Sequence, residues 1–412
     1  MLSNPDSLRV LHLANWNSTN IGNGALIKGS EKVFAEDYPG EVTFVPEAWD
    51  DYTFKRKKFD ESFVRMVNEK ADVLMVNGAV TFNAFRLNMN NAGMRFDLPL
   101  HLWDQIKVPV VLYGLSYRCW PFQKYPNTQA FTEMLRYAID NKRVFLGVRN
   151  DGTKEWIKER FAIDSPDIHE VPDPGLFVPA IDGKYPEINP ERKNVIIALN
   201  GEDAVYRYVT KTQKMLWGIA SLFASDFILE KIFKHTTGYR KRRREVSKKI
   251  AKVAEQLALK YDVQFILAPH YLDDYGMIEE FIEEVQERVA HQLVISTGLM
   301  AVPHTEYFYG RYAQADLVIA MRVHSMSPSI GLNTPVIPLT SQGRMRVFLK
   351  KLGLSDIAID ITDEDAIKQL LSKAESILDN PQPIKTKLHA ATDRARNDMR
   401  AVNQKLIEFI NN

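Results

Sequence analysis

The sequence has few of the features that mark secreted or membrane-spanning proteins. Its only cysteine is Cys119, which excludes disulfide bonds within the chain and favours a reducing, cytosolic setting. The first ten residues lack the basic-then-apolar pattern of a secretory signal. No apolar run reaches the ~20 residues that a membrane-spanning helix needs. The net charge is only +1, so no global field selects nucleic acid or a membrane surface.

Several catalytic signatures are also missing. Neither a Walker A motif nor a Gly-x-Ser-x-Gly motif occurs, which excludes P-loop enzymes and the common serine hydrolases. The turn with Gly22 and Gly24 is shorter than the full dinucleotide-binding pattern. The nearest approach to a metal site is His270 with Asp273 and Asp274, and its spacing matches no known metal signature. The sequence therefore predicts neither a metal nor a cofactor.

What the chain does have is a regular alternation of apolar strands with helices. Its composition, 45% hydrophobic and 25% charged, is ordinary for a globular protein. Strands are predicted at 10–14, 71–76, 108–113, 143–148, 169–172, 194–199, 263–268, 293–296, 317–321 and 336–339. Helices are predicted at 26–34, 154–161, 214–259, 278–289 and 363–412. Continuous apolar strands separated by helices indicate parallel sheets covered on both faces.

The pattern stops at a polar, proline-containing stretch, 182–192, and then restarts. With 412 residues, two domains are expected. We therefore predict an α/β protein with two Rossmann-like domains facing a cleft. The N-terminal domain would cover residues 1–185 and the C-terminal domain 186–375, followed by a helical tail over 376–412.

The most informative stretch is Ala315–Leu339. It is predicted to run from a buried strand into an Arg-x-His-Ser turn, then into a short helix with Ser327 as N-cap and Pro328 at the first helical position. This order places Arg322, His324 and Ser325 at the carboxyl end of a strand, beside a helix N-terminus. That edge is where ligands bind in open α/β sheets, and the positive helix end favours anions. The stretch suits an enzyme that handles a small phosphorylated acid.

Other polar residues follow strands elsewhere in the chain. Arg149 ends a strand, and it is either an anion clamp or an arginine paired with a nearby acid. Together with Arg322 and His324, the clamp is favoured. His270 also follows a strand and is a candidate for lining the cleft, whereas His12 lies inside a strand and is predicted to be a hydrogen-bonded core residue.

Two segments allow alternative interpretations. The turn at Asn20–Ala25 is either a tight strand-to-helix connection or a phosphate or substrate contact. The run at Tyr239–Lys249 is rich in lysine and arginine, and it is either a solvated helix face or a patch for an anionic acceptor such as a lipid-pyrophosphate at the membrane surface. Nucleic acid is the weakest partner for it, because aromatic residues are sparse there.

Five segments, in order, resemble motifs of the polysaccharide pyruvyl transferase family, and the similarity spans roughly residues 8–355. They are Asn20–Ala25, Asp72–Ala79, Phe145–Thr153, Val171–Leu176 and the stretch from Ala315 to Ser325 with Asn333–Pro338. The sequence departs from the family pattern at three places. Asn23 replaces an aspartate, Asn77–Gly78–Ala79 replaces a glycine triplet, and Arg344 stands where many members have lysine.

The resemblance implies transfer of pyruvate from phosphoenolpyruvate to a sugar of a cell-surface polysaccharide or its lipid-linked precursor, forming a ketal. It also implies a GT-B-like layout with the donor site mainly on the C-terminal domain. The positions that match the family's donor site are Arg149, Arg322, Val323 and His324. His324 would be the general acid, Arg149 and Arg322 would hold the phosphate and carboxylate, and Val323 would offer a backbone amide.

Further substrate-binding candidates lie in these motifs or follow other predicted strands. They are Ser325, Arg344, Gly22, Asn23, Gly24 and His270. The expected location is the cytoplasm, and the inner face of the cell membrane if residues 239–249 are the patch for an anionic acceptor. The alternatives are a glycosyltransferase of the same layout with a nucleotide-sugar donor, and a carbohydrate-binding module without catalysis.

Overall fold

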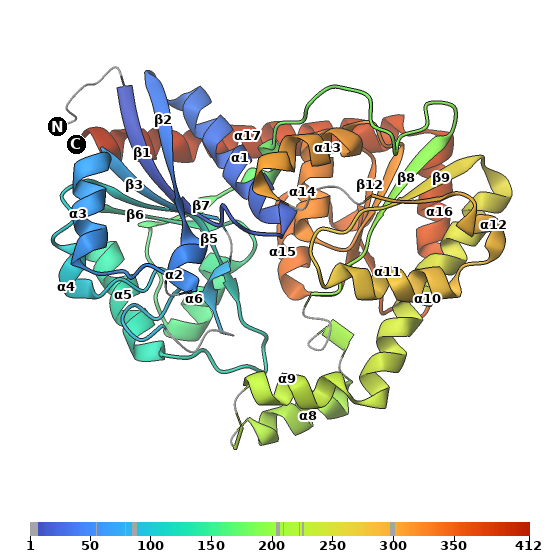
Figure 1. The fold of residues 1–412 in the computed structure, drawn as a ribbon, viewed down its shortest axis with the longest axis horizontal. Coiled ribbons are helices and arrows are strands. Elements are labelled where there is room, and N and C mark those ends of the chain that lie inside the picture. Colours follow the sequence, from blue (N-terminus) through green and yellow to red (C-terminus); the bar gives the residue numbers. More distant parts are fainter. Residues whose placement is uncertain are drawn as a thin grey trace. The chain divides into compact units, whose positions relative to one another are not determined.

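The chain forms two α/β units, each built on its own parallel β-sheet (Figure 1). The computed structural model describes residues 7–54, 56–78, 80–84, 89–202, 207–208, 210–221, 223–224, 226–296 and 301–412. Ala79, one of the positions that depart from the family pattern, lies outside these residues. The first unit comprises Met1–Ser18, Asn23–Phe177 and Ala395–Asn412, and the second Thr19–Gly22 and Val178–Arg394.

The first unit has a seven-stranded sheet in the order β2-β1-β3-β5-β6-β7, with β4 paired to β5. The strands are β1 (Ser7–Ala14), β2 (Glu41–Ala48), β3 (Val73–Asn77), β4 (Val80–Asn83), β5 (Val110–Arg118), β6 (Val144–Arg149) and β7 (Ile168–Val171). The helices are α1 (Ile21–Asp37), α2 (Trp49–Thr53), α3 (Glu61–Lys70), α4 (Leu100–Trp103), α5 (Thr128–Asp140), α6 (Thr153–Phe161) and the 3₁₀ turn η1 (Pro174–Phe177).

The second unit has a six-stranded sheet in the order β10-β9-β8-β11-β12-β13. The strands are β8 (Lys193–Ala198), β9 (Val263–Leu267), β10 (Leu293–Ile295), β11 (Leu317–Ala320), β12 (Val336–Thr340) and β13 (Ile359–Asp360). The helices that precede β11 are α8 (Lys211–Ala220), α9 (Asp226–Lys234), α10 (Thr237–Lys260), α11 (Asp274–Glu284), α12 (Glu287–Ala290), η2 (Val302–His304) and α13 (Thr305–Ala313). Those that follow it are α14 (Val323–Gly331), α15 (Gly343–Lys351), η3 (Ser355–Ile357), α16 (Ala366–Asp379) and α17 (Gln382–Asn411).

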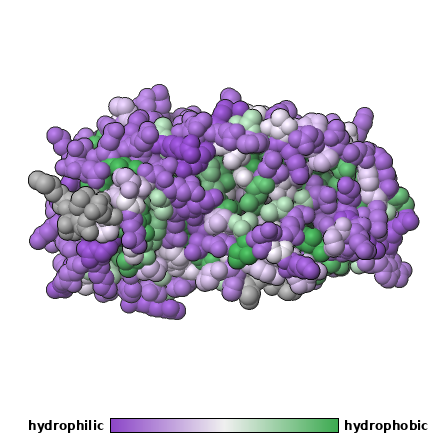
Figure 2. Space-filling model, turned by 90° about the horizontal axis from the view of Figure 1, so that it is seen from above, coloured by the Kyte–Doolittle hydropathy of each residue, from purple (hydrophilic) through white to green (hydrophobic). Residues whose placement is uncertain are grey.

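The central strands of both sheets are buried along their length, as the apolar runs predicted. β3, β6, β11 and β12 have no exposed residue, so helices and loops cover both faces of each sheet. Every strand pair described in either sheet is parallel. The α/β class with two Rossmann-like units is therefore confirmed. Outside these cores, the face of the molecule drawn in Figure 2 is largely hydrophilic.

The C-terminal helix α17 belongs to both units. Its residues up to Arg394 are grouped with the second unit and those from Ala395 with the first. In the first unit, the Tyr113 hydroxyl on β5 donates to Asn403 Oδ1 over 2.7 Å, and Asn403 Nδ2 donates to Asp37 Oδ2 at the end of α1 over 2.7 Å. The last segment of the chain is thus part of the core of the first unit.

His12 on β1 is a core residue, as predicted. It has no exposed surface. Its Nδ1 lies 3.0 Å from Glu31 Oε1 on α1, and its Nε2 lies 3.0 Å from Asn77 Nδ2 at the end of β3. Both ring nitrogens therefore have partners, which satisfies a buried imidazole.

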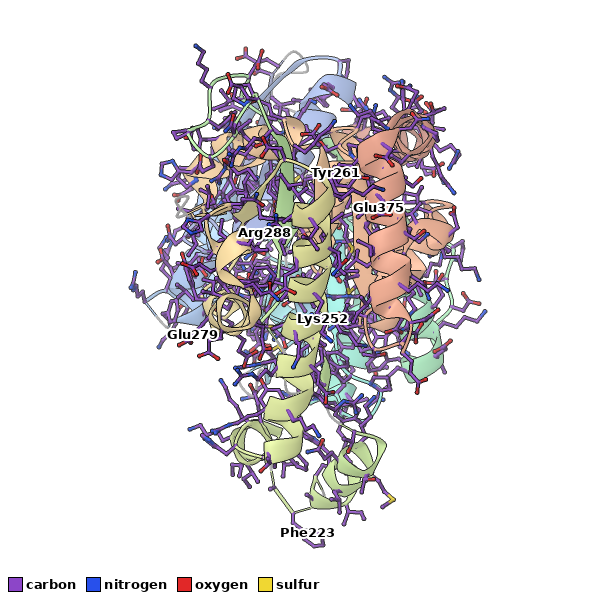
Figure 3. All side chains as sticks on the ribbon, turned by 90° about the vertical axis from the view of Figure 1, so that its right-hand side faces the viewer. Phe223, Lys252, Tyr261, Glu279, Arg288 and Glu375 are labelled. Atoms are coloured by element: carbon purple, nitrogen blue, oxygen red, sulfur yellow. The ribbon has the colours of Figure 1, made fainter. Side chains whose placement is uncertain are left out.

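The long predicted helix at 214–259 is divided in the structure. Two short helices, α8 and α9, precede α10, and α10 runs beside α16 along the edge of the second unit, where the labelled Lys252 and Tyr261 mark its course (Figure 3). The predicted helix at 278–289 is also interrupted, because α11 ends at Glu284 and α12 begins at Glu287.

Candidate functional site

The Arg-x-His-Ser turn lies at the carboxyl end of β11, and α14 begins immediately after it. Arg322 is the N-cap residue with extended backbone angles, and Val323 is the first helical residue. The Ser325 hydroxyl accepts the Arg322 N–H at 3.1 Å and donates to the Arg322 carbonyl at 2.8 Å. The predicted helix start at Ser327 is therefore wrong. The helix begins at Val323 because Ser325, rather than Ser327, bonds the backbone at its start.

Pro328 consequently lies inside α14 instead of at its first position. Proline has no N–H, so the carbonyl four residues earlier, that of His324, loses its usual helical partner. The Tyr309 hydroxyl on α13 donates to this carbonyl over 2.7 Å. This replaces the missing backbone bond and ties the His324 backbone to α13.

The Arg322 guanidinium is buried and engages two carboxylates. Its Nε lies 3.0 Å from Asp274 Oδ2, its Nη2 2.5 Å from Asp274 Oδ1, and its Nη1 2.6 Å from Glu202 Oε2. Burial alone would lower the pKa of Arg322, but Asp274 and Glu202 raise it above its ordinary value. Arg322 is therefore a fixed positive charge beside the N-terminus of α14.

Asp274 joins the carboxyl ends of three neighbouring strands. It has no exposed surface. Besides Arg322 after β11, it accepts the N–H groups of Gly201 after β8 at 2.9 Å and of His270 after β9 at 2.9 Å. A side chain at Gly201 would collide with the backbone of Asp273, 1.8 Å from its carbonyl oxygen. Glycine at 201 thus allows the loop after β8 to reach Asp274.

His270 lies beside this network in an aromatic enclosure. Its Nε2 is 2.6 Å from the Tyr312 hydroxyl, and the rings of Phe308, Tyr309 and Tyr312 meet it edge to face. Burial, followed by the charge of Arg322, holds the pKa of His270 well below its ordinary value. The imidazole is therefore neutral at neutral pH, and its Nδ1 has no hydrogen-bond partner among the described residues.

The N-terminus of α1 packs directly against His324. The Ile21 N–H donates to the His270 carbonyl over 3.0 Å, and the Gly22 N–H to Asn20 Oδ1 over 3.0 Å. A Cβ at Gly22 would lie 2.7 Å from His324 Nδ1 and 2.8 Å from its Cβ, closer than such contacts allow. Only glycine fits here while the helix keeps its path.

The turn predicted at Asn20–Ala25 is therefore the start of a helix, because α1 begins at Ile21 and not at Leu26. Asn20 and Ser18 supply polar partners that begin it. Asn23 donates through Nδ2 to Ser18 Oγ over 2.8 Å, and Gly24 is buried within the first turns. A substrate contact at Gly22, Asn23 or Gly24 stays a prediction.

Arg149 belongs to the first unit, at the carboxyl end of β6. Its side chain is buried, with Nη1 3.5 Å from Asp173 Oδ2 and Nη2 3.4 Å from the Gly114 carbonyl. Asp173 follows β7 and accepts the Gly175 N–H at 2.8 Å. The structure thus pairs Arg149 with an acid at a strand end, and its role as an anion clamp stays a prediction.

Val323 and Arg344 lie on the same edge of the second sheet as Arg322. Val323 opens α14 after β11. Arg344 is in the first turn of α15, which follows the neighbouring strand β12, and both residues are partly exposed. Two helix N-termini thus meet this edge, an arrangement that favours anions.

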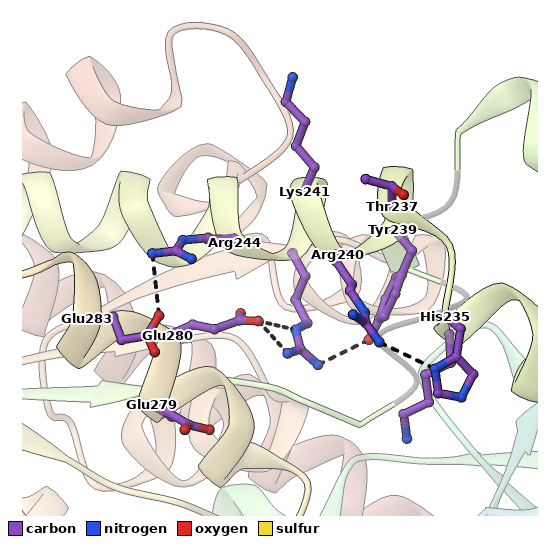
Figure 4. A pocket seen from close by; sticks show the side chains of 11 residues that line it. His235, Thr237, Tyr239, Arg240, Lys241, Arg244, Glu279, Glu280 and Glu283 are labelled. Carbon is purple, nitrogen blue, oxygen red and sulfur yellow. Dashed lines mark hydrogen bonds and ion pairs between the residues drawn. The ribbon is translucent and has the colours of Figure 1, made fainter.

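The basic segment at Tyr239–Lys249 forms the first half of α10 and lines an open pocket of about 770 Å³ against α11 (Figure 4). Arg243 Nε donates to Glu280 on α11 over 2.8 Å, and Arg244 Nε to Glu284 over 2.6 Å. Arg240 and Lys241 are exposed. Arg243, Arg244 and Lys248 of the segment are therefore paired with the acidic face of α11.

Asp274, Glu202 and Tyr309 are parts of the site that the motif did not reveal. Asp274 is 48 residues from Arg322 in sequence, and Tyr309 is 15 residues from His324. The one available signal was position, because Glu202 and Asp274 both follow predicted strands of one sheet. Among the described residues, no group of three or more His, Cys, Asp or Glu side chains is arranged to hold a metal.

No helix of the described chain is long and apolar enough to cross a membrane.

The fold is similar to solved structures of sugar-handling enzymes. A glycosyltransferase from Rickettsia africae matches with a TM-score of 0.50 and 9% identity, covering 98% of this chain and 99% of that one. A candidate UDP-N-acetylglucosamine 2-epimerase from Listeria monocytogenes matches with a TM-score of 0.50 and 13% identity, covering 96% and 91%. These similarities extend over both units and support a GT-B-like fold. No curated protein sequence matches at a significant level.

The sequence itself matches a family model described as polysaccharide pyruvyl transferase over residues 20–343. That range contains both units' strand-end arginines and the whole Arg322–Ser325 turn. It includes most of each sheet, from the N-terminus of α1 to the start of α15. The chain therefore belongs to the polysaccharide pyruvyl transferase family, whose members are transferases that act on polysaccharides.

Proposed function

We propose that this protein transfers a pyruvyl group from phosphoenolpyruvate to two hydroxyls of a saccharide, forming a cyclic ketal and releasing phosphate. The observation that carries the proposal is the Arg322–Val323–His324 turn. It combines a buried guanidinium, a helix N-terminus and a partly exposed imidazole at one strand end. The family match supports the same reaction.

The donor carries a carboxylate and a phosphate, and both need positive partners. Each nitrogen of Arg322 already bonds a carboxylate, but a guanidinium has five N–H groups. The remaining N–H groups on Nη1 and Nη2 would face the donor, together with the amides at the start of α14. Glu202 is the more exposed of the two acids, so it is the one that an incoming anion would displace. Arg149 would hold the donor's second anionic group.

His324 would act on protons. As an acid it would protonate C3 of the enol, which converts C2 into a cation-like electrophile and C3 into a methyl group. One saccharide hydroxyl then adds to C2 and loses its proton, phosphate leaves, and the second hydroxyl closes the ketal and loses its proton. A histidine titrates near neutral pH and serves as acid and then as base. His270 is a poor second candidate for the acid, because its lowered pKa keeps it neutral.

The acceptor would be a saccharide of a cell-surface polysaccharide or its lipid-linked precursor, and the reaction would take place in the cytoplasm at the inner face of the membrane. The single cysteine supports this setting. In the basic segment, Arg240 and Lys241 are two exposed cations that an anionic acceptor would meet.

The test is incubation with phosphoenolpyruvate and a set of saccharides, with product mass and phosphate release measured together. A pyruvyl ketal formed with equal release of phosphate is the expected result. The GT-B-like fold also suits a nucleotide-sugar-dependent glycosyltransferase. Thermal shift separates the two, because a bound ligand raises apparent stability. Stabilisation by a nucleotide-sugar and none by phosphoenolpyruvate would replace the proposal with the glycosyltransferase.

A further inference from the structure

The helices α8 and α9 expose an unusual concentration of large apolar side chains. Of the fourteen exposed large apolar residues in the described chain, six fall between positions 215 and 232. They are Met215, Leu216, Ile219, Phe223, Ile228 and Ile232. Phe223 is the most exposed of them, at 86%. Scattered apolar residues are normal on a protein surface, but a gathered set marks an interaction site.

These residues are not needed to hold the two helices together. A separate set does that, because the rings of Trp217 on α8 and Phe233 on α9 stack with centroids 4.8 Å apart and Leu229 is buried with them. On α9, Leu229 and Phe233 form the inner face. Ile228 and Ile232, one position earlier in each turn, point outward. The helix pair therefore has a packed inner face and a second, apolar outer face.

The pair lies at the margin of the second unit. Figure 1 shows α8 and α9 at the N-terminal end of α10, away from the six-stranded sheet. Figure 3 places Phe223 at the outer end of the pair, with its ring directed away from α10. A flat surface that approached this end would meet Phe223 first.

Positive charge is concentrated in the sequence in and next to the helix pair. Residues 211–244 contain nine lysines and arginines and two acidic residues, whereas the whole chain is nearly neutral. Arg243 and Arg244 are paired with α11. The exposed cations nearest the helix pair in sequence are Lys214, Lys231, Lys234, Arg240 and Lys241.

Apolar side chains flanked by lysine and arginine match the interface of an anionic bilayer, where apolar groups enter the acyl boundary and cations meet lipid headgroups. A second copy of the chain is a poorer partner, because a two-fold interface would bring the same cations face to face. The helices α8 and α9 have ten and nine residues, about half of what a spanning helix needs. They would therefore lie in the interface.

We propose that the α8–α9 pair is a membrane anchor. Met215, Ile219, Phe223 and Ile232 enter the surface of an anionic phospholipid bilayer, and the neighbouring cations hold its headgroups. The apolar residues of the anchor lie outside the basic segment at Tyr239–Lys249, which contributes only Arg240 and Lys241 and whose Arg243 and Arg244 pair with α11. The anchor does not depend on the reaction proposed above, because any acceptor embedded in or tethered to the membrane would be reached in the same way.

The experiment is flotation of the full chain with vesicles of phosphatidylcholine, with and without phosphatidylglycerol. The protein should float with the anionic vesicles and much less with the neutral ones. The double variant Ile219→Asp, Phe223→Asp should bind the anionic vesicles about tenfold or more weakly, since two apolar groups leave the bilayer. The matched control is Leu259→Asp, at the other end of α10, which is 59% exposed and should bind as the parent does.

A labelled variant gives a second readout. Because Cys119 is the only cysteine, a Cys119→Ser, Phe223→Cys variant carries an environment-sensitive dye at position 223 alone. Its emission should shift to the blue on anionic vesicles. Equal flotation of the double variant and the parent would overturn the anchor, and so would an unshifted dye. A dimer in vesicle-free buffer that the double variant abolishes would assign the face to a second copy instead.

Discussion

Arg322 is held through both oxygens of Asp274, a residue that also bonds the loops after β8 and β9. The guanidinium of the family motif is therefore positioned by an aspartate far away in sequence. The orientation of the Arg322 side chain is therefore set by the three strand ends that Asp274 joins. The functional turn of α14 thus depends on the folding of the whole edge of the second sheet.

Asp274→Asn should be severely destabilising. The amide keeps the size of the side chain, but its NH₂ group would face the donors of Arg322 or of the backbone. Breaking a buried ion pair on one side costs about 3–5 kcal/mol, and denaturant unfolding measures it. The matched control is Asp273→Asn, one residue earlier and exposed, which should change little. Equal losses in the two variants would show that Asp274 does not hold the edge together.

Arg322→Lys keeps the positive charge but loses the planar guanidinium that can bond two oxygens side by side. A lysine ammonium cannot bond both oxygens of Asp274 as a guanidinium does. It also cannot bond Glu202 and a donor anion at the same time. Hydrogen bonds to charged groups contribute about 1.5–3 kcal/mol, so kcat/KM for phosphoenolpyruvate should fall about ten- to a hundredfold. Arg346→Lys, an exposed arginine that pairs with Asp360, is the control. Unchanged donor kinetics in a folded Arg322→Lys enzyme would remove Arg322 from the site.

His324→Gln should separate donor binding from catalysis. Glutamine still forms hydrogen bonds but delivers no proton to C3, so the rate should fall about 10²–10⁴-fold. Phosphoenolpyruvate should still bind in a calorimeter, because Arg149 and Arg322 remain. In heavy water the parent enzyme should place deuterium in the ketal methyl group. The control is His291→Gln, an exposed histidine. Parental turnover by His324→Gln would show that the acid is elsewhere.

Gly22→Ala tests the contact between α1 and His324. The added methyl would lie 2.7 Å from His324 Nδ1, so the imidazole or the helix must move. Overpacking costs about 1–3 kcal/mol of stability, and a displaced catalytic group about tenfold to a hundredfold in kcat. Gly218→Ala, where an added Cβ has no neighbour within 4 Å, should leave kcat with a water-soluble saccharide unchanged. A Gly22→Ala enzyme with normal kcat would show that this contact does not position His324.

His270 should make the free energy of unfolding depend on pH. Its pKa in the folded state is lowered, chiefly by burial, whereas in the unfolded chain it should be about 6.5. The unfolded state then binds more protons, so the free energy of unfolding should fall as the pH drops below about 6.5. His270→Gln should reduce this slope between pH 5 and 7. A slope equal to that of the parent would show that folding does not lower the pKa of His270.

The strands of both sheets were predictable wherever they are buried on two faces. β2 shows the limit of this reasoning. It lies at the edge of its sheet, and most of its residues are exposed or partly exposed, so its sequence, Glu41–Ala48, contains no continuous apolar run. The strands β13 and β4 are missed for a different reason, because at two and four residues they are too short to form a recognisable pattern.

Only those parts of the site that a local sequence pattern marks could be predicted. The Arg322–Ser325 turn follows an apolar strand, which indicated its place on the sheet edge. The helix start was misplaced because Ser327 and Pro328 resemble a helix beginning, whereas a tyrosine from α13 makes an internal proline tolerable at this point. The sequence indicates only a possible metal ligand at Asp274, because nothing in it shows that three loops converge on this side chain.

The contribution of α17 to the first unit has a consequence for the order of biosynthesis. The ribosome makes β1 to β7 first, yet the buried partner of Tyr113 is Asn403, and Met399 and Leu406 are buried on the same helix. Domains usually fold as they emerge during translation. The first unit, although most of it is translated before the second, therefore cannot complete its core until α17 has also been made.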